Sequence, residues 1–294
     1  MQNPQNTMNI KNIFVPVDFS ENAYQALEYA AQMAAACGAE ITVAHIFEVR
    51  VTPDGINMPP MEYVNELTEA KEEEIKNYME RFLSKVGHPK YKDREGQVVF
   101  HTLVREGFLV SELVATATPD QYDLIIMGTK GANGIARLLW GSLTAEVMEK
   151  AKIPVLAIPQ NATYDKGIQK ITYATDLKLD ETPNIETLRG FADQFDARLT
   201  CLHISTDTER VTEGAQRMLS LEEKFYFTPI SKLDFKLLRG ERVEKSLKDY
   251  LKVEEPDVIA MKPHQRNFIE NLMHASMTRK MVLHTEIPLL TLRK

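Results

Sequence analysis

The sequence predicts an α/β protein made of two tandem units, each a mostly parallel sheet with helices on both of its faces. Three observations support this fold class. The chain has 294 residues, about twice the common domain size of about 150 residues. Short apolar segments alternate with longer amphipathic ones, as in parallel strands connected by helices. The whole order of segments then occurs a second time.

The repeat is visible in two blocks that align without gaps. Residues 11–46 match residues 169–204, and residues 123–159 match residues 257–293. Because both blocks occur in the same order, we infer a tandem duplication. The identical pairs include Ile13 and Ile171, Asp18 and Asp176, His45 and His203, Asp123 and Asp257, and Met127 and Met261.

The boundary between the two units is expected in the polar stretch 160–169, which lacks apolar periodicity. We therefore expect one domain at residues 10–160 and a second at residues 168–294. The first domain carries extra residues between about 47 and 102, so the second has a shorter middle section.

The first half of the first unit reads as two strands around a helix. NIFVPV (12–17) is a short run rich in β-forming residues. Alanine and leucine then recur at helical spacing over residues 20–37. Ser20 suits the N-cap of this helix and Gly38 its end. The second strand is ITVAHIF (41–47).

The second half continues the alternation of helices and strands. The charged segment 62–86 has the pattern of an amphipathic helix with a solvated face. DLIIMG (123–128) is a continuous apolar run, typical of a strand buried on both faces. The other expected elements are strands at 96–103 and 154–158, a helix near 108–117 and a helix from about Ser142.

Composition narrows the classes of function. Lys and Arg total 35 against 42 Asp and Glu, which gives a net charge of −7, so a general affinity for nucleic acid is not expected. No run reaches the roughly 18 apolar residues of a membrane helix, and the polar start of the chain lacks a signal-peptide core. Cys37 and Cys201 form neither a disulfide framework nor a zinc pattern. We therefore expect a cytoplasmic protein without a metal site.

The segment most informative about function follows the apolar strand 123–128. Gly128, Gly131 and Gly141 are separated by two and by nine residues, and Ser142 follows the last glycine. Glycine permits a left-handed backbone and the close approach of an anion, and the N-terminus of the next helix offers N–H groups to that anion. Ser142 can cap this helix or donate its hydroxyl to a phosphate oxygen. The spacing matches neither the P-loop nor the Rossmann dinucleotide pattern.

This spacing, G-x2-G-x9-G-S, resembles that of the nucleotide-binding members of the universal stress protein A family. The resemblance extends to VPVDFS (15–20), HIF (45–47) and IPVLAIP (153–159), so it covers the first unit and, more faintly, the second. It implies two tandem Rossmann-like domains of the adenine nucleotide alpha hydrolase-like type, each with a five-stranded sheet. It also implies ATP as the ligand, with ADP and AMP as alternatives and Mg²⁺ left open.

In such relatives, residues at the positions of Pro16, Asp18 and Ile46 lie against adenine. Residues at the positions of Met127 and Gly128 line the base and ribose side, and the later glycines admit the phosphates. No catalytic and no metal-binding residue is implied. The resemblance thus implies a nucleotide site formed by Pro16, Val17, Asp18, Ile46, Met127, Gly128, Gly131, Gly141, Ser142 and Leu143.

These assignments have structural alternatives. Asp18 could close a turn or cap the first helix, and the glycines could serve only the turn between strand and helix. His45 and His203, at equivalent strand ends, are interpreted as half-buried structural histidines rather than catalytic ones.

The second unit has lost the glycine pattern. Lys262, Gln265 and Ala275 stand where the first unit has its three glycines, and Ala174 replaces Pro16. Side chains at these points should not admit phosphates in the same way. We therefore expect one nucleotide site in each chain and a structural or regulatory role for the second domain.

The favoured function is that of an ATP-binding stress-response or signalling protein. A slow ATPase or phosphotransferase is the weaker alternative, because no general base is evident beside the glycine segment and no H-x-G-H adenylylating signature is present. A scaffold that binds no nucleotide is the third hypothesis. A protein partner is expected but its identity is unknown; nucleic acid and membranes are not expected as partners.

The last strands of the two units, 154–158 and 288–292, are expected to pair with each other. Members of the resembling family commonly dimerise through this strand, and two fused units can satisfy the pairing within one chain. The chain would then be an internal pseudo-dimer. A homodimer of whole chains is left open.

Overall fold

Strands and helices alternate along the chain. The computed structural model describes residues 7–48, 61–86, 98–129, 142–206, 211–226, 232–262 and 287–293. The first unit forms β1 (Asn12–Pro16), α1 (Glu21–Cys37), β2 (Glu40–Phe47), α2 (Met61–Val86), β3 (Phe100–Glu106), α3 (Leu109–Thr116), β4 (Leu124–Gly128), α4 (Ser142–Lys150) and β5 (Val155–Ile158). The second forms β6 (Lys170–Thr175), α5 (Thr182–Gln194), β7 (Arg198–Ser205), α6 (Val211–Phe225), β8 (Leu233–Arg239), α7 (Val243–Glu254), β9 (Val258–Met261) and β10 (Leu289–Thr291).

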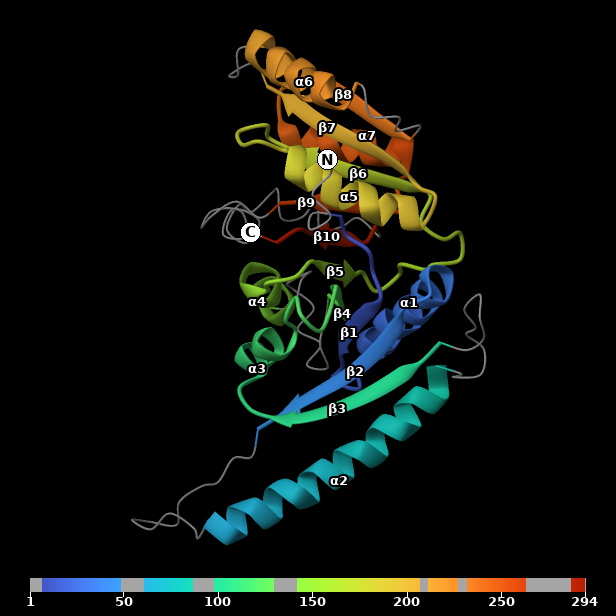
Figure 1. Cartoon of the computed structure of the whole chain (residues 1–294), viewed down its shortest axis with the longest axis vertical. Helices are drawn as coiled ribbons and strands as arrows, with labels where there is room; N and C mark the ends of the chain where they lie inside the picture. Colours follow the sequence, from blue (N-terminus) through green and yellow to red (C-terminus); the bar gives the residue numbers. More distant parts are fainter. Residues whose placement is uncertain are drawn as a thin grey trace.

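The ten strands of the described residues belong to one continuous sheet, in the order β3-β2-β1-β4-β5-β10-β9-β6-β7-β8 (Figure 1). Neighbouring strands within each unit are parallel. The order 3-2-1-4-5 of the first unit recurs, reversed, in the second. This arrangement confirms the predicted α/β class with a mostly parallel sheet.

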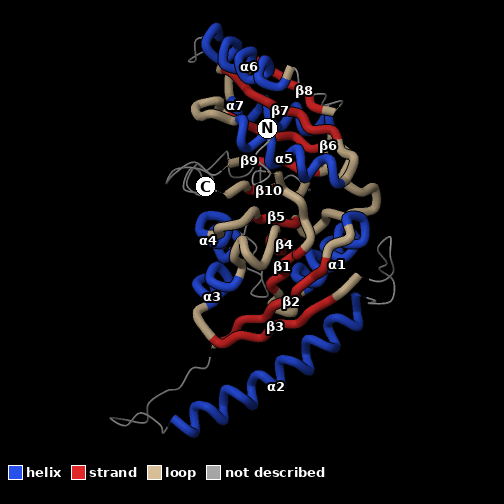
Figure 2. The backbone as a smooth tube through the Cα atoms, viewed as in Figure 1, coloured by secondary structure: helices blue, strands red, loops and turns tan. Residues whose placement is uncertain are grey.

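Helices cover both faces of the sheet, as predicted (Figure 2). Helices α1, α2, α5 and α6 contribute to one apolar core, and α3, α4 and α7 contribute to the other. Each core contains residues of both units, so the two units share their hydrophobic interior. Across the described ranges, no helix is both long and apolar enough to cross a membrane.

The two units meet at the antiparallel pair β5–β10. Leu156 pairs with Leu290, and these two residues are equivalent in the aligned blocks 123–159 and 257–293. The seam therefore has the geometry of an isologous contact, in which equivalent residues face each other across a two-fold axis. The predicted pairing of the two last strands, and with it the internal pseudo-dimer, is confirmed.

Local hydrogen bonds repeat between the units. The side chain of Asp123 accepts from the backbone N–H groups of residues 11–12 at 2.8 and 2.9 Å. The side chain of Asp257 accepts from those of residues 169–170 at 2.7 and 2.8 Å. Because each carboxylate ties the start of one strand to the start of its neighbour, the aligned aspartates have the same structural role in both units.

The ends of the first helix agree with the sequence pattern. Ser20 is the N-cap of α1, and its Oγ accepts from the N–H of Ala23 at 3.2 Å. Gly38 is left-handed, with φ of 71°, and its N–H donates to the carbonyl of Ala34 at 2.8 Å. Ser20 and Gly38, which the sequence predicted as caps, therefore mark the two ends of α1 in the structure.

The third strand lies further along the chain than predicted. The expectation was 96–103, whereas β3 spans Phe100–Glu106 and pairs with β2 from Ile41 to Phe47. β3 is one of the two edge strands of the described sheet and is largely exposed, so no buried apolar run marks its ends. Its extent is set by the length of the neighbouring strand that supplies its hydrogen bonds.

The chain before β1 packs against the second unit. The N–H of Met8 donates to the carbonyl of Thr187 in α5 at 3.3 Å, and the side chain of Gln194 bonds both the N–H and the carbonyl of Ile10. A Cβ at Gly190 would lie 2.8 Å from the backbone of Met8. Glycine at this helical position therefore permits the close backbone contact that ties the two units together.

Candidate functional site

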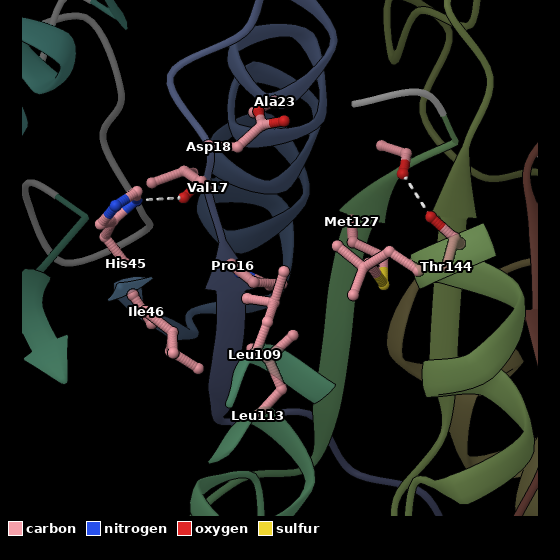
Figure 3. A pocket seen from close by; sticks show the side chains of 13 residues that line it. Pro16, Val17, Asp18, Ala23, His45, Ile46, Leu109, Leu113, Met127 and Thr144 are labelled. Atoms are coloured by element: carbon pink, nitrogen blue, oxygen red, sulfur yellow. Dashed lines mark hydrogen bonds between the residues drawn. The ribbon is translucent and has the colours of Figure 1, made fainter. Parts of the chain in front are cut away.

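A cavity opens at the carboxyl ends of β1, β2 and β4 in the first unit (Figure 3). The neighbours of β1 in the sheet are β2 on one side and β4 on the other, so the strand order reverses here. In open α/β sheets, such a switch point is where ligands bind. The cavity encloses about 110 Å³, less than the roughly 300–1,000 Å³ of common ligand pockets. It can therefore enclose only part of a nucleotide-sized ligand.

The predicted site residues whose side chains are described all line this one cavity. Ser142 is the first residue of α4, but its side chain lies outside the described part, as do Gly131 and Gly141. The pattern therefore selected residues that are far apart along the chain but adjacent in the folded protein. The predicted residues lining the cavity are Pro16, Val17, Asp18, Ile46, Met127, Gly128 and Leu143.

Several lining residues were not predicted as site residues. Leu109 and Leu113 enter from α3, and Figure 3 shows them pointing into the cavity from one side. Their spacing of four residues indicates one helix face, but nothing in the sequence says that this face meets β1. Ala23, Ala44, His45 and Thr144 complete the lining.

Asp18 closes a turn at the end of β1 and also borders the cavity. Its Oδ1 accepts from the N–H of Ser20 at 3.1 Å, and Phe19 between them is left-handed, with φ of 61°. The second unit repeats this turn: Asp176 Oδ1 accepts from the N–H of residue 178 at 3.1 Å, and the intervening Leu177 has φ of 57°. A left-handed residue with a bulky side chain is strained, so both units maintain a strained turn beside the strand end. The turn interpretation of Asp18 is therefore confirmed, and its side chain also borders the cavity.

Gly128 is a glycine for a reason that the sequence did not indicate. Gly128 does not use the left-handed backbone that glycine permits, because the described glycines with positive φ are Gly38, Gly107 and Gly167. A Cβ at Gly128 would instead lie 2.8 Å from the carbonyl oxygen of Asn22, in the first turn of α1. Its carbonyl accepts a hydrogen bond from Thr144 at 2.9 Å, which holds α4 against the end of β4. The missing Cβ of Gly128 therefore lets α1 approach this strand end, where the Gly128 carbonyl also anchors α4.

His45 is a hydrogen-bonded structural residue at the rim of the cavity. Its Nδ1 lies 2.7 Å from the carbonyl oxygen of Val17, so this nitrogen carries the proton and donates it. The ring stacks on Phe19 with centroids 4.6 Å apart. Burial lowers the pKa of His45, and the Val17 hydrogen bond and the charge of Asp18 offset this effect only in part. The neutral imidazole is therefore the stable form at neutral pH.

Acid is predicted to weaken the fold through His45. An unfolded histidine titrates near the ordinary pKa of about 6.5, and the pKa of His45 in the folded chain is lower. Between these two pKa values the unfolded chain binds a proton that the folded chain does not, so stability falls as the pH drops below about 6.5. His45→Asn retains a donor for the Val17 carbonyl but does not titrate. In urea unfolding at about pH 7.5 and about pH 5, this variant should lose less stability than the natural protein; equal losses would contradict the assignment.

The fold and the cavity define a class of protein: a doubled parallel α/β protein with a cavity at the carboxyl ends of its strands. Residues 9–159 match the model of the universal stress protein family. The chain belongs to this family. The described part of the match includes all the strands of the first unit and the cavity between them.

Relatives cover either one unit or the whole chain. Universal stress protein MJ0577 of Methanocaldococcus jannaschii is 30% identical over 159 residues, which are 50% of this chain and 94% of that protein. Universal stress protein Slr1230 of Synechocystis is 25% identical over 301 residues, which are 97% of this chain and 100% of that protein. A universal stress protein from Archaeoglobus fulgidus has the same fold over 98% of both chains, with a TM-score of 0.68 and 17% identity. The tandem arrangement is therefore shared with other universal stress proteins.

Proposed function

We propose that the first unit binds an adenine nucleotide, ATP in the first instance, and that occupancy of this site controls the protein's conformation or its affinity for a partner in stress response or signalling. The observation that carries the proposal is the single cavity that gathers Pro16, Asp18, Ile46 and Met127. These are the positions to which the resemblance assigns the base.

The geometry of the cavity supports a base rather than a whole nucleotide inside it. Pro16, Ile46 and Met127 form apolar walls, and Asp18 at the rim can accept a hydrogen bond from an amino or hydroxyl group. The volume of about 110 Å³ leaves the ribose and phosphates outside, toward Gly128 and the start of α4. The first N–H groups of a helix favour anions at such a position.

Calorimetric titration of the nucleotide-stripped chain with ATP and Mg²⁺ tests the proposal. We expect about one ATP per chain and a raised melting temperature, since a ligand at about 100 times its Kd stabilises by about 2.7 kcal/mol. Leu109→Trp places a large ring at the cavity wall and should raise the Kd for ATP about tenfold or more. Leu219→Trp is the matched control, because Leu219 is 56% exposed on α6 and does not line the cavity.

Two outcomes would redirect the interpretation. No heat and no thermal shift at millimolar ATP would favour a scaffold without nucleotide. Phosphate release that Leu109→Trp abolishes and Leu219→Trp preserves would favour the ATPase. Repeating the titration with ADP, with AMP and with EDTA in place of Mg²⁺ identifies the preferred nucleotide and its need for metal.

A further inference from the structure

A second, larger cavity occupies the equivalent place in the second unit. It lies at the carboxyl ends of β6, β7 and β9, with α7 on one side and α6 on another. Its volume is about 650 Å³, within the range of about 300–1,000 Å³ that is common for small-molecule sites. The second unit has therefore kept a cavity although its glycine pattern is gone.

The frame around this cavity repeats that of the first. Asp176, His203, Ile204 and Met261 line it, and they are identical to the aligned residues Asp18, His45, Ile46 and Met127. The Nδ1 of His203 lies 2.9 Å from the carbonyl of Thr175 at the strand end, as His45 does from Val17. Three of the four positions assigned to the base in the proposed first site, those of Asp18, Ile46 and Met127, are therefore identical in the second, whereas Ala174 replaces Pro16.

The remaining lining differs in a way that disfavours polyphosphates. Two acidic side chains, Asp176 and Glu213, border the cavity together with two basic ones, Lys178 and Arg217. Asp176 and Lys178 form an ion pair at 3.2 Å, and Glu213 and Arg217 one at 4.0 Å. A balanced rim provides no net positive field for a polyanion. Lys262 follows β9 at the position where Gly128 ends β4. A phosphate therefore cannot approach the backbone at Lys262 as closely as it could approach a glycine.

The same rim suits a ligand with little charge. Leu202, Ile204, Leu247 and Met261 form an apolar wall for a flat ring, and the carboxylates of Asp176 and Glu213 can accept from amino or hydroxyl groups. Arg217 can meet one anionic group without the need for a phosphate loop.

We propose that the cavity of the second unit binds a purine nucleoside or its monophosphate and excludes the triphosphate. The choice of a nucleoside rests on the proposed function of the first site, because it follows from the three shared positions that are assigned to the base there. Binding at the second cavity can nevertheless be measured when the first site is weakened and the second cavity is altered independently, so the two proposals can fail separately.

The test uses the full chain with Leu109→Trp in every variant, so that binding at the first cavity is weakened, and only binding that a substitution in the second cavity removes is assigned to the second cavity. Calorimetric titration with adenosine and with AMP should show about one ligand per chain, and ATP should bind at least about tenfold more weakly than AMP. Adding Val243→Trp should abolish binding, because Val243 begins α7, lines the cavity and is 44% exposed, which leaves room for the ring without core disruption. Adding Val253→Trp is the matched control on the same helix, because Val253 is 80% exposed and does not line the cavity.

A second substitution tests whether Arg217 recognises the phosphate of AMP in a chain that is still folded. Arg217→Ala should raise the Kd for AMP and leave that for adenosine unchanged, since only AMP carries a phosphate. Melting temperatures verify that each variant is folded. The proposal is overturned if the Leu109→Trp chain binds neither adenosine nor AMP at millimolar concentration, if Val243→Trp leaves their binding intact, or if ATP binds there as tightly as AMP.

Discussion

Glu181→Ala is expected to lower the free energy of unfolding by about 3–5 kcal/mol, because it removes the acceptor of a buried polar network. Glu181 is 2% exposed. Its Oε2 accepts from the hydroxyl of Tyr173 at 2.5 Å and from the amide of Asn184 at 2.7 Å, and its Oε1 accepts from Thr175 at 2.7 Å. Each buried donor that loses its acceptor costs about 1–3 kcal/mol.

The network is confined to the second unit. The aligned residues of the first unit are Val15, Val17, Ala23 and Ala26, all of which are buried. The same backbone frame thus supports an apolar interior in one unit and a polar one in the other. Burial and the Glu181 carboxyl raise the pKa of Tyr173, so its hydroxyl remains protonated and serves as a donor.

Urea unfolding of a double-mutant cycle measures this effect. Tyr173→Phe, Glu181→Ala and the double variant should show a coupling energy of about 1–3 kcal/mol, because the phenylalanine leaves one fewer orphaned donor. Thr187→Ala is the control, since its hydroxyl donates to the carbonyl of Pro183 within α5 and does not bond to Glu181, Tyr173 or Asn184 in the network described above. A loss below about 1 kcal/mol for Glu181→Ala would show that water or rearrangement satisfies the donors.

Gly128→Ala is expected to lower the free energy of unfolding by about 1–3 kcal/mol and to weaken ATP binding at the same time. The added Cβ would lie 2.8 Å from the carbonyl oxygen and 3.1 Å from the carbonyl carbon of Asn22. These are backbone atoms in the first turn of α1, so they can move only if the helix start moves. Because that helix start follows directly on the turn of Asp18, the cavity rim should shift with it.

Comparison with the second unit explains why a Cβ at this position would clash with the start of a helix only in the first unit. There Lys262 has a Cβ at the aligned position, and α5 begins at Thr182, whereas the residue aligned with the start of α1 is Leu179. The turn that would collide with the Cβ is therefore not helical. Lys262→Ala is the matched control and should leave stability unchanged in urea unfolding. Equal stability of Gly128→Ala and the natural protein would contradict the packing explanation of Gly128.

Much of the architecture was predictable because it depends on patterns that are local in the chain. Apolar periodicity located the strands 12–17 and 123–128 and the helices 20–37 and 62–86 to within a residue or two. The family resemblance, together with the internal repeat, predicted that the two last strands pair, and the β5–β10 pair confirms it. The spacing of glycines and the family resemblance selected residues that the structure places around one cavity.

Other features were decided only by tertiary structure. The extent of β3, the contribution of α3 to the cavity and the contact between Gly128 and Asn22 all depend on which elements meet in space. The second unit looked like a relic in sequence because its glycines are replaced, yet its cavity is the larger of the two. The physical reason is the same throughout. Periodicity and spacing report what a segment does with its own neighbours, whereas a cavity or a buried network arises from side chains that fold together from distant segments.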